Sequence, residues 1–132
     1  MNFVEFSKRF AEEIDGQYNE YDDKKSVFVV PLSDGRNQTV IAEIFDHETY
    51  KREVVRVDSK ICNLFSPIKY SEILAASAEF VHARFIAEDN FLKAEASFFL
   101  DSLDENTIKE MILEVAKTAD EWELKITGKD IH

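Results

Sequence analysis

The fold of this chain depends on residues 80–100, which read FVHARFIAEDNFLKAEASFFL. In the first half, apolar side chains occupy every second position: Val81, Ala83, Phe85 and Ala87. In the second half, one set of alternate positions is again apolar: Leu92, Ala94, Ala96 and Phe98. A period of two is typical of strands, and the polar residues 88–90 can form a turn between the halves. We therefore predict a β-hairpin that joins Phe80–Ala87 to Phe91–Leu100.

A helix upstream of this stretch gives an alternative interpretation. It begins at Pro67, with Ser66 as a possible cap, and carries three apolar residues: Ile68, Ile73 and Leu74. Continued onward, several further residues still fit one face of a helix: Ile73, Ser77, Phe80 or Val81, and Phe85. One unbroken helix from Pro67 to Asn90 is therefore an alternative. Aromatic and β-branched residues favour strands, so we expect the helix to end near Ala78.

The chain after the hairpin predicts a long amphipathic helix. Asp104 is a good N-cap, and Leu103 with Ile108 has the spacing of a hydrophobic staple. The apolar residues recur in steps of three and four: Ile108, Met111, Ile112, Val115, Ala119, Trp122 and Ile126. Gly128 is suited to the left-handed conformation that ends many helices. We expect this helix to pack on the sheet through its apolar stripe.

The N-terminal residues predict a second amphipathic helix. Asn2 can cap it, Glu5 lies three residues later, and Gly16 can end it. One face of this helix is strongly apolar: Phe3, Phe6, Phe10 and Ile14. Such a face needs a covering sheet, subunit or ligand.

Between these helices the sequence predicts a three-stranded meander. The polar segment 17–25 is a connection that can hold a short extended piece at residues 18–21. Ser26–Leu32 and Gln38–Phe45 follow as strands joined by a tight turn at Asp34-Gly35. That turn pairs Phe28 with Ile41 and Val29 with Val40. Pro31 lacks an N–H, which favours an edge position for its strand.

A second turn, at residues 46–49, leads into the third strand, Tyr50–Asp58. A four-residue loop there places Glu43 opposite Arg52 and Ile41 opposite Val54. The complete order is α-β-β-β-α-β-β-α. We predict an α+β fold in which one antiparallel sheet of five strands packs against three helices, with residues 1–132 forming a single domain.

The composition excludes several classes of partner and site. The 27 acidic and 16 basic side chains give a net charge of −11, which argues against nucleic acid and against anionic membranes as partners. The single cysteine, Cys62, excludes an internal disulfide and a cysteine-based zinc site. The N-terminus lacks a basic start followed by an apolar block. We therefore expect no signal peptide and a cytoplasmic protein.

The element order and the acidic charge resemble the bacterial type III secretion chaperone superfamily, including its YbjN-like relatives. The resemblance lies mainly in the Phe80–Leu100 hairpin, in the helix start Ser102-Leu103-Asp104-Glu105, and in residues 114–123, which read EVAKTADEWE. It implies a homodimer that binds an extended segment of another protein, without nucleotide or metal. Main-chain pairing at a strand edge suits such binding, and the negative charge favours a basic partner.

Two groups of apolar residues are candidates for the protein-binding surface. On the first helix they are Phe3, Phe6 and Phe10; on the first long strand they are Phe28 and Val30. The simpler alternative is that the three phenylalanines pack under the sheet, because amphipathic stripes normally face a core. Residues 27–30 are apolar at every position, so one face of that strand is core and the other is a candidate interface.

We predict no catalytic, cofactor-binding or metal-binding residues. Asp46-His47-Glu48 has metal-ligand side chains, but a solvated turn is the simpler interpretation. His82 is interpreted as a strand residue, and no motif supplies a base that would activate Cys62. The chain lacks phosphate-binding glycine loops, a nucleophile elbow and calcium-loop spacing.

These observations predict a non-enzymatic protein-binding module, chaperone-like or regulatory, that acts as a homodimer and holds an extended segment of a partner polypeptide. One alternative is a small-molecule-binding or enzymatic α+β domain with a pocket between sheet and helix, which would need His47, His82 or Cys62 to converge. Another is an acidic inhibitor or immunity-type protein that blocks a basic site.

Overall fold

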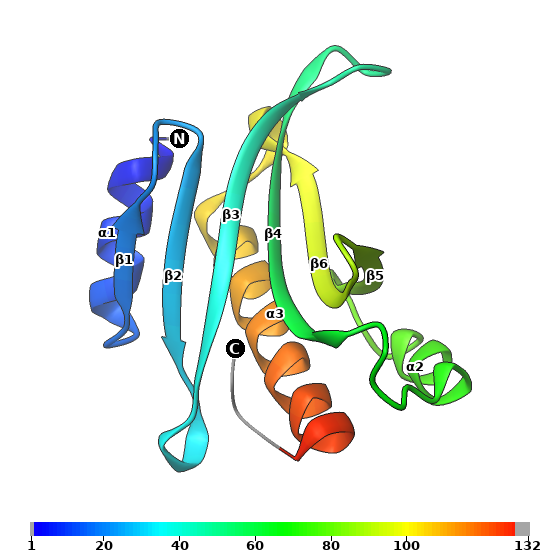
Figure 1. Ribbon diagram of the computed structural model, residues 1–132. Helices are drawn as coiled ribbons and strands as arrows, with labels where there is room; N and C mark the ends of the chain where they lie inside the picture. Colours follow the sequence, from blue (N-terminus) through cyan, green and yellow to red (C-terminus); the bar gives the residue numbers. More distant parts are fainter. Residues whose placement is uncertain (1, 129–132) are drawn as a thin grey trace.

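The computed structural model describes residues 2–128, and its centre is an antiparallel sheet (Figure 1). Within that range the sheet has six strands in the order β1-β2-β3-β4-β6-β5. The strands are β1 (Gln17–Glu20), β2 (Lys25–Pro31), β3 (Asn37–His47), β4 (Arg52–Asn63), β5 (Arg84–Glu88) and β6 (Phe91–Phe99). The helices are α1 (Phe3–Glu13), α2 (Tyr70–Ser77) and α3 (Glu105–Thr127), with short 3-10 turns at Ser33–Gly35 and Leu100–Ser102. The predicted α+β class is confirmed.

The hairpin predicted at residues 80–100 is present as β5 and β6. Asp89 and Asn90 form its turn with positive φ angles of 55° and 67°. The alternative of one helix through this stretch is wrong, because α2 ends at Ser77. β5 begins later than predicted, at Arg84, since the backbone N–H groups of residues 81–83 bond to the side chain of Glu114 instead of to a strand.

Helix α3 covers the centre of one sheet face, as its apolar stripe predicted. The Thr107 N–H donates to Asp104 Oδ1 at 2.7 Å, and Gly128 ends the helix with a φ of 73°. The stripe residues from Ile108 to Ala119 are buried against the sheet, and Trp122 packs edge-on against Phe85 of β5, with ring centres 5.8 Å apart. Each fully buried Ile, Val or Met side chain of this stripe contributes about 1.5–3 kcal/mol to the free energy of unfolding, because it is removed from water on folding.

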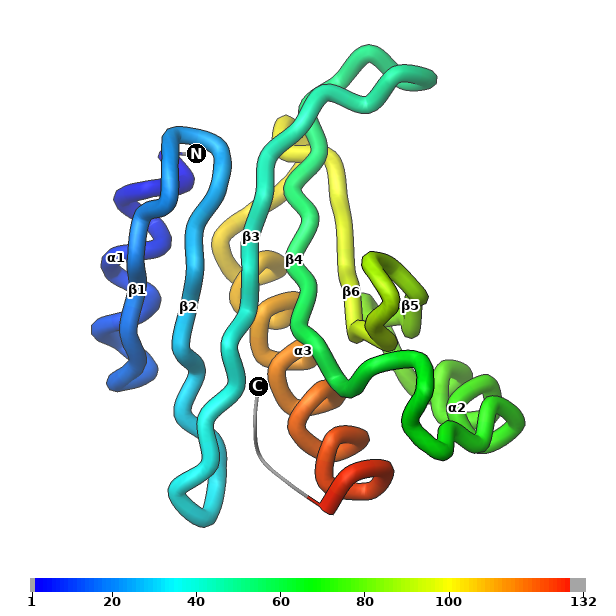
Figure 2. Tube along the Cα trace, viewed as in Figure 1, coloured from blue at the N-terminus to red at the C-terminus, as the bar shows by residue number. Residues whose placement is uncertain are grey.

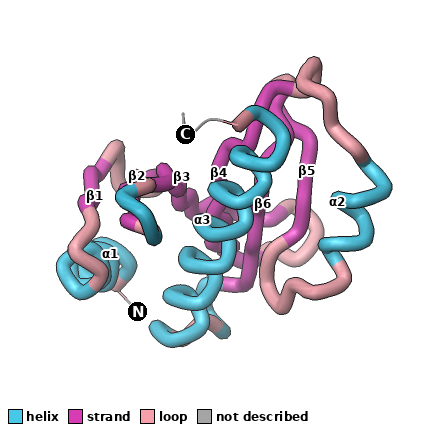
Figure 3. The backbone as a smooth tube through the Cα atoms, turned by 90° about the horizontal axis from the view of Figure 1, so that it is seen from below, coloured by secondary structure: helices cyan, strands magenta, loops and turns pink. Residues whose placement is uncertain are grey.

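Helix α1 packs on the same face as α3, beside β1 and β2 (Figure 3). Asn2 Oδ1 accepts from the Glu5 N–H at 3.1 Å, which confirms the predicted cap. Phe6 and Phe10 stack on each other, and Phe10 contacts Phe28 of β2 with ring centres 6.3 Å apart. The opposite face of the sheet carries no helix in the described part of the chain (Figures 1 and 3). We call it the open face.

The sixth strand, β1, corrects the predicted position of β2. β1 pairs with β2 from Gln17↔Val29 to Glu20↔Ser26, so β2 is not an edge strand. Pro31 is tolerated because it is the last residue of β2 and lies beyond the residues that pair with β1. The predicted extended piece at residues 18–21 corresponds to β1, shifted by one residue.

Both predicted hairpin registers are wrong, because the loops differ from those assumed. Phe28 pairs with Val40, since residues 32–36 form a five-residue loop in which Asp34 and Gly35 have positive φ angles. Ile41 pairs with Asp58 and not Val54, and Glu43 pairs with Arg56 and not Arg52. The register between β3 and β4 differs from the predicted one because His47 pairs with Arg52. This pairing moves the loop from the predicted residues 46–49 to residues 48–51.

The second helix also begins later than predicted. α2 starts at Tyr70, after Lys69, and not at Pro67. Ser66 does not cap it, because its hydroxyl bonds instead to the Asn63 side chain. α2 lies beside β5, at the edge of the sheet (Figure 3). Its eight residues are therefore placed outside the main helix layer.

Candidate functional site

A groove of about 450 Å³ lies on the open face, between the β3–β4 hairpin and the end of β6. The tip of that hairpin extends beyond the neighbouring strands and bends to one side (Figure 2). A row of cross-strand partners, Phe45↔Val54↔Phe99, runs over three adjacent strands and lines the groove. Tyr50 and Phe98 add aromatic surface beside this row. The groove therefore has mainly apolar walls.

The aromatic rings of the groove brace one another. Tyr50 meets Phe99 edge-on with ring centres 5.4 Å apart, and the His47 ring lies 5.1 Å from Tyr50. The Arg52 guanidinium lies 3.7 Å from the centre of the Phe99 ring and also pairs with Asp101. Phe45 and Tyr50 are nevertheless exposed. These contacts hold a wall of aromatic side chains open to solvent.

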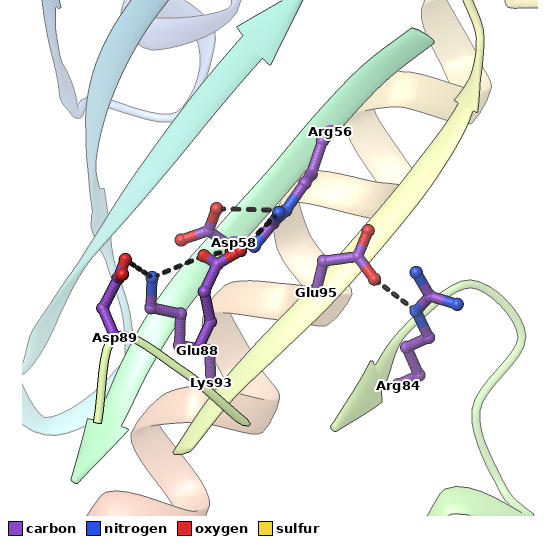
Figure 4. A network of polar contacts seen from close by, with 7 residues as sticks. All are labelled: Arg56, Asp58, Arg84, Glu88, Asp89, Lys93 and Glu95. Atoms are coloured by element: carbon purple, nitrogen blue, oxygen red, sulfur yellow. Dashed lines mark hydrogen bonds and ion pairs between the residues drawn. The ribbon is translucent and has the colours of Figure 1, made fainter. Parts of the chain in front are cut away.

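A network of ion pairs lies on the open face, and three of its members, Arg56, Arg84 and Glu95, line the groove together with the aromatic walls (Figure 4). The two terminal nitrogens of Arg56 bond to the two carboxylate oxygens of Glu88 at 2.9 and 2.7 Å. Lys93 bonds to the same carboxylate at 2.9 Å. The Arg56 and Lys93 bonds lower the pKa of Glu88 to about 2. Glu88 is therefore ionised throughout the neutral range and holds two cations on neighbouring strands.

Two further members of the network, Asp58 and Glu95, are buried although they lie on the open face. Glu95 is only 1% exposed, and its carboxylate pairs with Arg84. Burial raises the pKa of Asp58, against the opposing effect of Lys93 and Arg56. Within residues 2–128 each charge of the network thus has an opposite charge near it. We interpret the network as a rigid support for the groove.

The α2 region exposes a second set of large apolar side chains. The exposed fractions are 92% for Phe65, 55% for Tyr70, 73% for Leu74 and 82% for Val81. Tyr70 and Leu74 lie one turn apart on the same face of α2. Ile73 is the one buried residue in this helix. We call Phe65, Tyr70, Leu74 and Val81 the α2 patch.

The candidate residues on α1 and β2 lie in the core. Phe3, Phe6, Phe10, Phe28 and Val30 are all buried, and together they attach α1 to the sheet. This is the arrangement expected of an amphipathic stripe that faces a core. Contact of these five residues with a partner stays a prediction.

Asp46-His47-Glu48 lies at the end of β3 and the start of the loop that follows. His47 Nδ1 accepts from the backbone N–H groups of Thr49 and Tyr50 at 3.2 and 3.4 Å. This ring nitrogen therefore shapes the turn. Across residues 2–128, no group of three or more metal-ligating side chains comes together.

His82 and Cys62 lie apart from His47 and from each other. His82 Nε2 is 3.4 Å from Glu110 on α3, whereas Cys62 is buried beside Ser66 and Glu123. Burial raises the pKa of the Cys62 thiol, although Ser66 opposes this effect. A thiol with a raised pKa is a weak nucleophile at neutral pH. The convergence that the enzymatic alternative needs is absent among these three residues.

The sequence patterns did not predict the groove. Phe45, Phe98 and Phe99 lie in predicted strands, but no pattern indicated which face of those strands stays uncovered. The Phe98-Phe99 pair could have indicated the groove. Neighbouring residues of a strand point to opposite faces of the sheet, so only one of the two aromatic rings can point to the core. Tyr50, at a hairpin loop, was a second signal.

No protein-family model matches the chain, and no curated protein matches it. Among solved structures, the chain is similar to one chain of the structure described as "Structure of the HopA1-SchA Chaperone-Effector Complex". The sequence identity is 14%, the match covers 96% of this chain and 94% of that chain, and the TM-score is 0.55. At this identity the likeness shows the fold, which is the α+β arrangement of a chain found in a chaperone–effector complex.

Within residues 2–128, no helix is both long and apolar enough to cross a bilayer.

Proposed function

We propose that this protein is a non-enzymatic, chaperone-like or regulatory module that holds an extended segment of a partner polypeptide on the open face of its sheet. The observation that carries the proposal is the groove, whose aromatic walls are held in place and left exposed. Exposed apolar surface of this kind marks interaction sites. The likeness in fold to a chain of a chaperone–effector complex supports the same class of function.

The chemistry of the groove fits a side chain of the partner better than a reacting substrate. Its apolar walls gain free energy by burying an apolar side chain, about 1.5–3 kcal/mol for one of the size of Leu or Phe. The charged side chains beside the walls are paired with one another, although Arg56 Nε and Glu95 Oε1 are buried without a hydrogen-bond partner in the described part of the chain. The net charge of −11 favours a segment with basic residues around its apolar anchor.

Strand addition supplies a second element of the proposed binding. β1 and β5 are the two edges of the described sheet. An extended segment that pairs with an edge gains main-chain hydrogen bonds, while the groove selects its side chains. β5 adjoins β6, which carries the groove residue Phe99, so we favour β5 as the pairing edge.

We further propose that the protein acts as a homodimer and that the α2 patch is its interface. The patch is the second large set of exposed apolar side chains, and it is separate from the groove. Light scattering across a range of protein concentrations tests this proposal. We expect dimers for the wild type and monomers for Leu74→Asp; a wild type that is monomeric at every concentration would overturn it.

The groove is tested by selecting random extended peptides on the wild-type protein and titrating the best binder into two variants. We expect Phe45→Asp to weaken binding at least tenfold, since it places a charge in the apolar wall. The matched control is Tyr21→Asp, which changes an exposed aromatic residue outside the groove and should leave affinity unchanged. Equal effects of the two substitutions would contradict the proposal.

A further inference from the structure

The Glu95 carboxylate of β6 has one oxygen without a partner. Its Oε2 accepts a hydrogen bond from Arg84 Nε, whereas Oε1 is buried and has no hydrogen-bond partner within residues 2–128. The residue as a whole is 1% exposed, although it lines the groove. A buried charged oxygen without a hydrogen bond lowers the stability of a fold. A ligand that donates a hydrogen bond to Oε1 therefore gains an interaction that the described chain leaves unmade.

Glu95 lies at the end of the groove that is further from the tip of the β3–β4 hairpin. It precedes the groove residue Phe99 by four positions on β6, so the two side chains share a face of the sheet. At about 3.3 Å per residue, they are about 13 Å apart along the strand. Figure 4 shows one oxygen of Glu95 directed at Arg84 and the other directed away from it. The groove thus combines an aromatic end with an end that offers a hydrogen-bond acceptor.

The charges around Glu95 favour a basic group as its ligand. Arg56, which also lines the groove, bonds to Glu88 through both terminal nitrogens, and its Nε lies 3.5 Å from Asp58 Oδ2. The network of Figure 4 comprises three basic and four acidic residues: Arg56, Arg84, Lys93, Asp58, Glu88, Asp89 and Glu95. When all of them are ionised, the network has one negative charge in excess. One further cation therefore neutralises it.

We infer that Glu95 determines the specificity of the groove: its Oε1 accepts a hydrogen bond from a lysine or arginine side chain of the partner segment, beside the apolar side chain that the aromatic end binds. This inference rests on the proposed function and names the chemistry of the segment. Lysine and arginine suit the groove, because their aliphatic stems pack on apolar walls while the charged end reaches a polar group. The hydrogen bond to a carboxylate is charge-assisted and therefore strong.

The basic side chain reaches Oε1 when a neighbouring side chain moves, because this oxygen is buried. The side chain of Arg84 is 67% exposed, whereas that of Arg56 is 22% exposed and is held by two bonds to Glu88. Arg84 is therefore the neighbour that changes rotamer at the lower cost. Its positive charge also competes with the incoming cation for the same carboxylate.

The test uses the full chain and the best peptide from the selection of random extended peptides. Each basic residue of that peptide is replaced in turn by a neutral analogue of similar shape, norleucine for lysine or citrulline for arginine. Calorimetry gives the ratio of the two dissociation constants, neutral over basic, for each protein variant. Because the ratio compares two peptides on one protein, a general weakening of the fold does not by itself change it.

The variants are Glu95→Gln, which keeps the size of the side chain and removes its charge, and Glu43→Gln as the matched control. Glu43 is exposed, precedes Phe45 by two positions on β3 and so shares its face, but does not line the groove. It therefore reports the effect of removing one negative charge from the open face alone.

For one basic residue of the peptide we expect a ratio of at least ten on the wild type, a ratio below two on Glu95→Gln, and a ratio within twofold of the wild type on Glu43→Gln. That residue should lie two or four positions from an apolar residue, because alternate side chains of an extended segment share a face and four residues span about 13 Å. A selected peptide without a basic residue, or a ratio that Glu95→Gln leaves unchanged, would overturn the inference.

Arg84→Gln keeps the inference testable if Glu95→Gln does not fold. It removes the cation that the chain itself places on Glu95, so the cation of the peptide gains importance. We expect the ratio to rise at least threefold above that of the wild type; an equal or lower ratio would overturn the inference.

The effect of Phe45→Asp separates this inference from the proposed function. If Phe45→Asp weakens binding while Glu95→Gln leaves the ratio unchanged, the groove binds the segment and only the role of Glu95 is wrong. If Phe45→Asp leaves binding unchanged, the proposed binding in the groove is wrong, and the role of Glu95 is wrong with it.

Discussion

Helices α2 and α3 use apolar residues in opposite ways. α3 has 23 residues, a side-chain cap at its start, a left-handed glycine at its end, and a buried apolar stripe. α2 has eight residues, no side-chain cap and one buried residue, although its composition is more apolar. The apolar residues of α3 therefore stabilise the fold, whereas most of those of α2 are available to a partner. Under the proposed homodimer, stability depends on α3 and assembly depends on α2.

The largest expected effect contrasts a buried residue of α3 with an exposed residue of α2. Ile112 of α3 is fully buried, so Ile112→Ala should lower the free energy of unfolding by about 2–5 kcal/mol. Leu74→Ala on α2 should change it by less than about 0.5 kcal/mol, because that side chain is exposed. Urea unfolding of dilute, monomeric protein measures both. A large cost for Leu74→Ala would mean that α2 belongs to the core.

The caps give the next contrast. Asp104→Ala removes the acceptor of the Thr107 N–H, and we expect the Tm to fall by about 4 °C. Lys69, at the equivalent position of α2, makes no capping bond, so Lys69→Ala should leave the Tm unchanged. Thermal unfolding followed by circular dichroism measures both variants. Equal shifts would show that the cap does not distinguish the two helices.

The cap of α3 should also make its start sensitive to pH. The Thr107 backbone bond holds the pKa of Asp104 below its ordinary value, so the folded state binds this proton less readily than the unfolded state. The stabilisation is then complete above about pH 4 and is lost as the pH falls through the lowered pKa. The Tm difference between wild type and Asp104→Ala should be full at pH 7 and shrink towards pH 2. A constant difference would contradict this assignment.

The smallest effect concerns the surface ion pair at the start of α3. Arg9 of α1 makes two bonds of 3.0 Å to Glu105, but both side chains are exposed. Exposed pairs contribute little to stability. Arg9→Gln should therefore shift the Tm by no more than about 2 °C at moderate salt. A larger fall would mean that α3 depends on surface charge as well as on its buried stripe.

Local patterns of the sequence were sufficient to predict most elements. The alternation in residues 80–100 predicted the hairpin, and Asp104 and Asn2 were identified as caps because capping depends on residues three positions apart. The register of β3 and β4 could not be predicted, since it follows from the loop at residues 48–51 and from the bonds that His47 makes within it. The start of β5 likewise depends on Glu114, a contact between distant parts of the chain.

The binding surfaces were harder to predict than the fold. The stripe of Phe3, Phe6 and Phe10 was a candidate because it is apolar, but apolar stripes form cores as readily as interfaces. Phe45 and Phe99 occupy the alternate positions opposite to the buried residues of their strands, such as Ala42 and Ala96, so they point to the other face of the sheet. Whether a sheet face is covered depends on where the helices pack in three dimensions. The alternation of apolar residues along a strand does not specify that packing.

The central claim is that a partner segment binds in the groove of the open face. It is tested most directly by recording the backbone amide spectrum of the protein while a selected peptide is added. We expect the affected amides to cluster in β3, β4 and β6 around Phe45, Val54 and Phe99. Changes confined to α1 and the helix-covered face, with the groove unaffected, would contradict the claim.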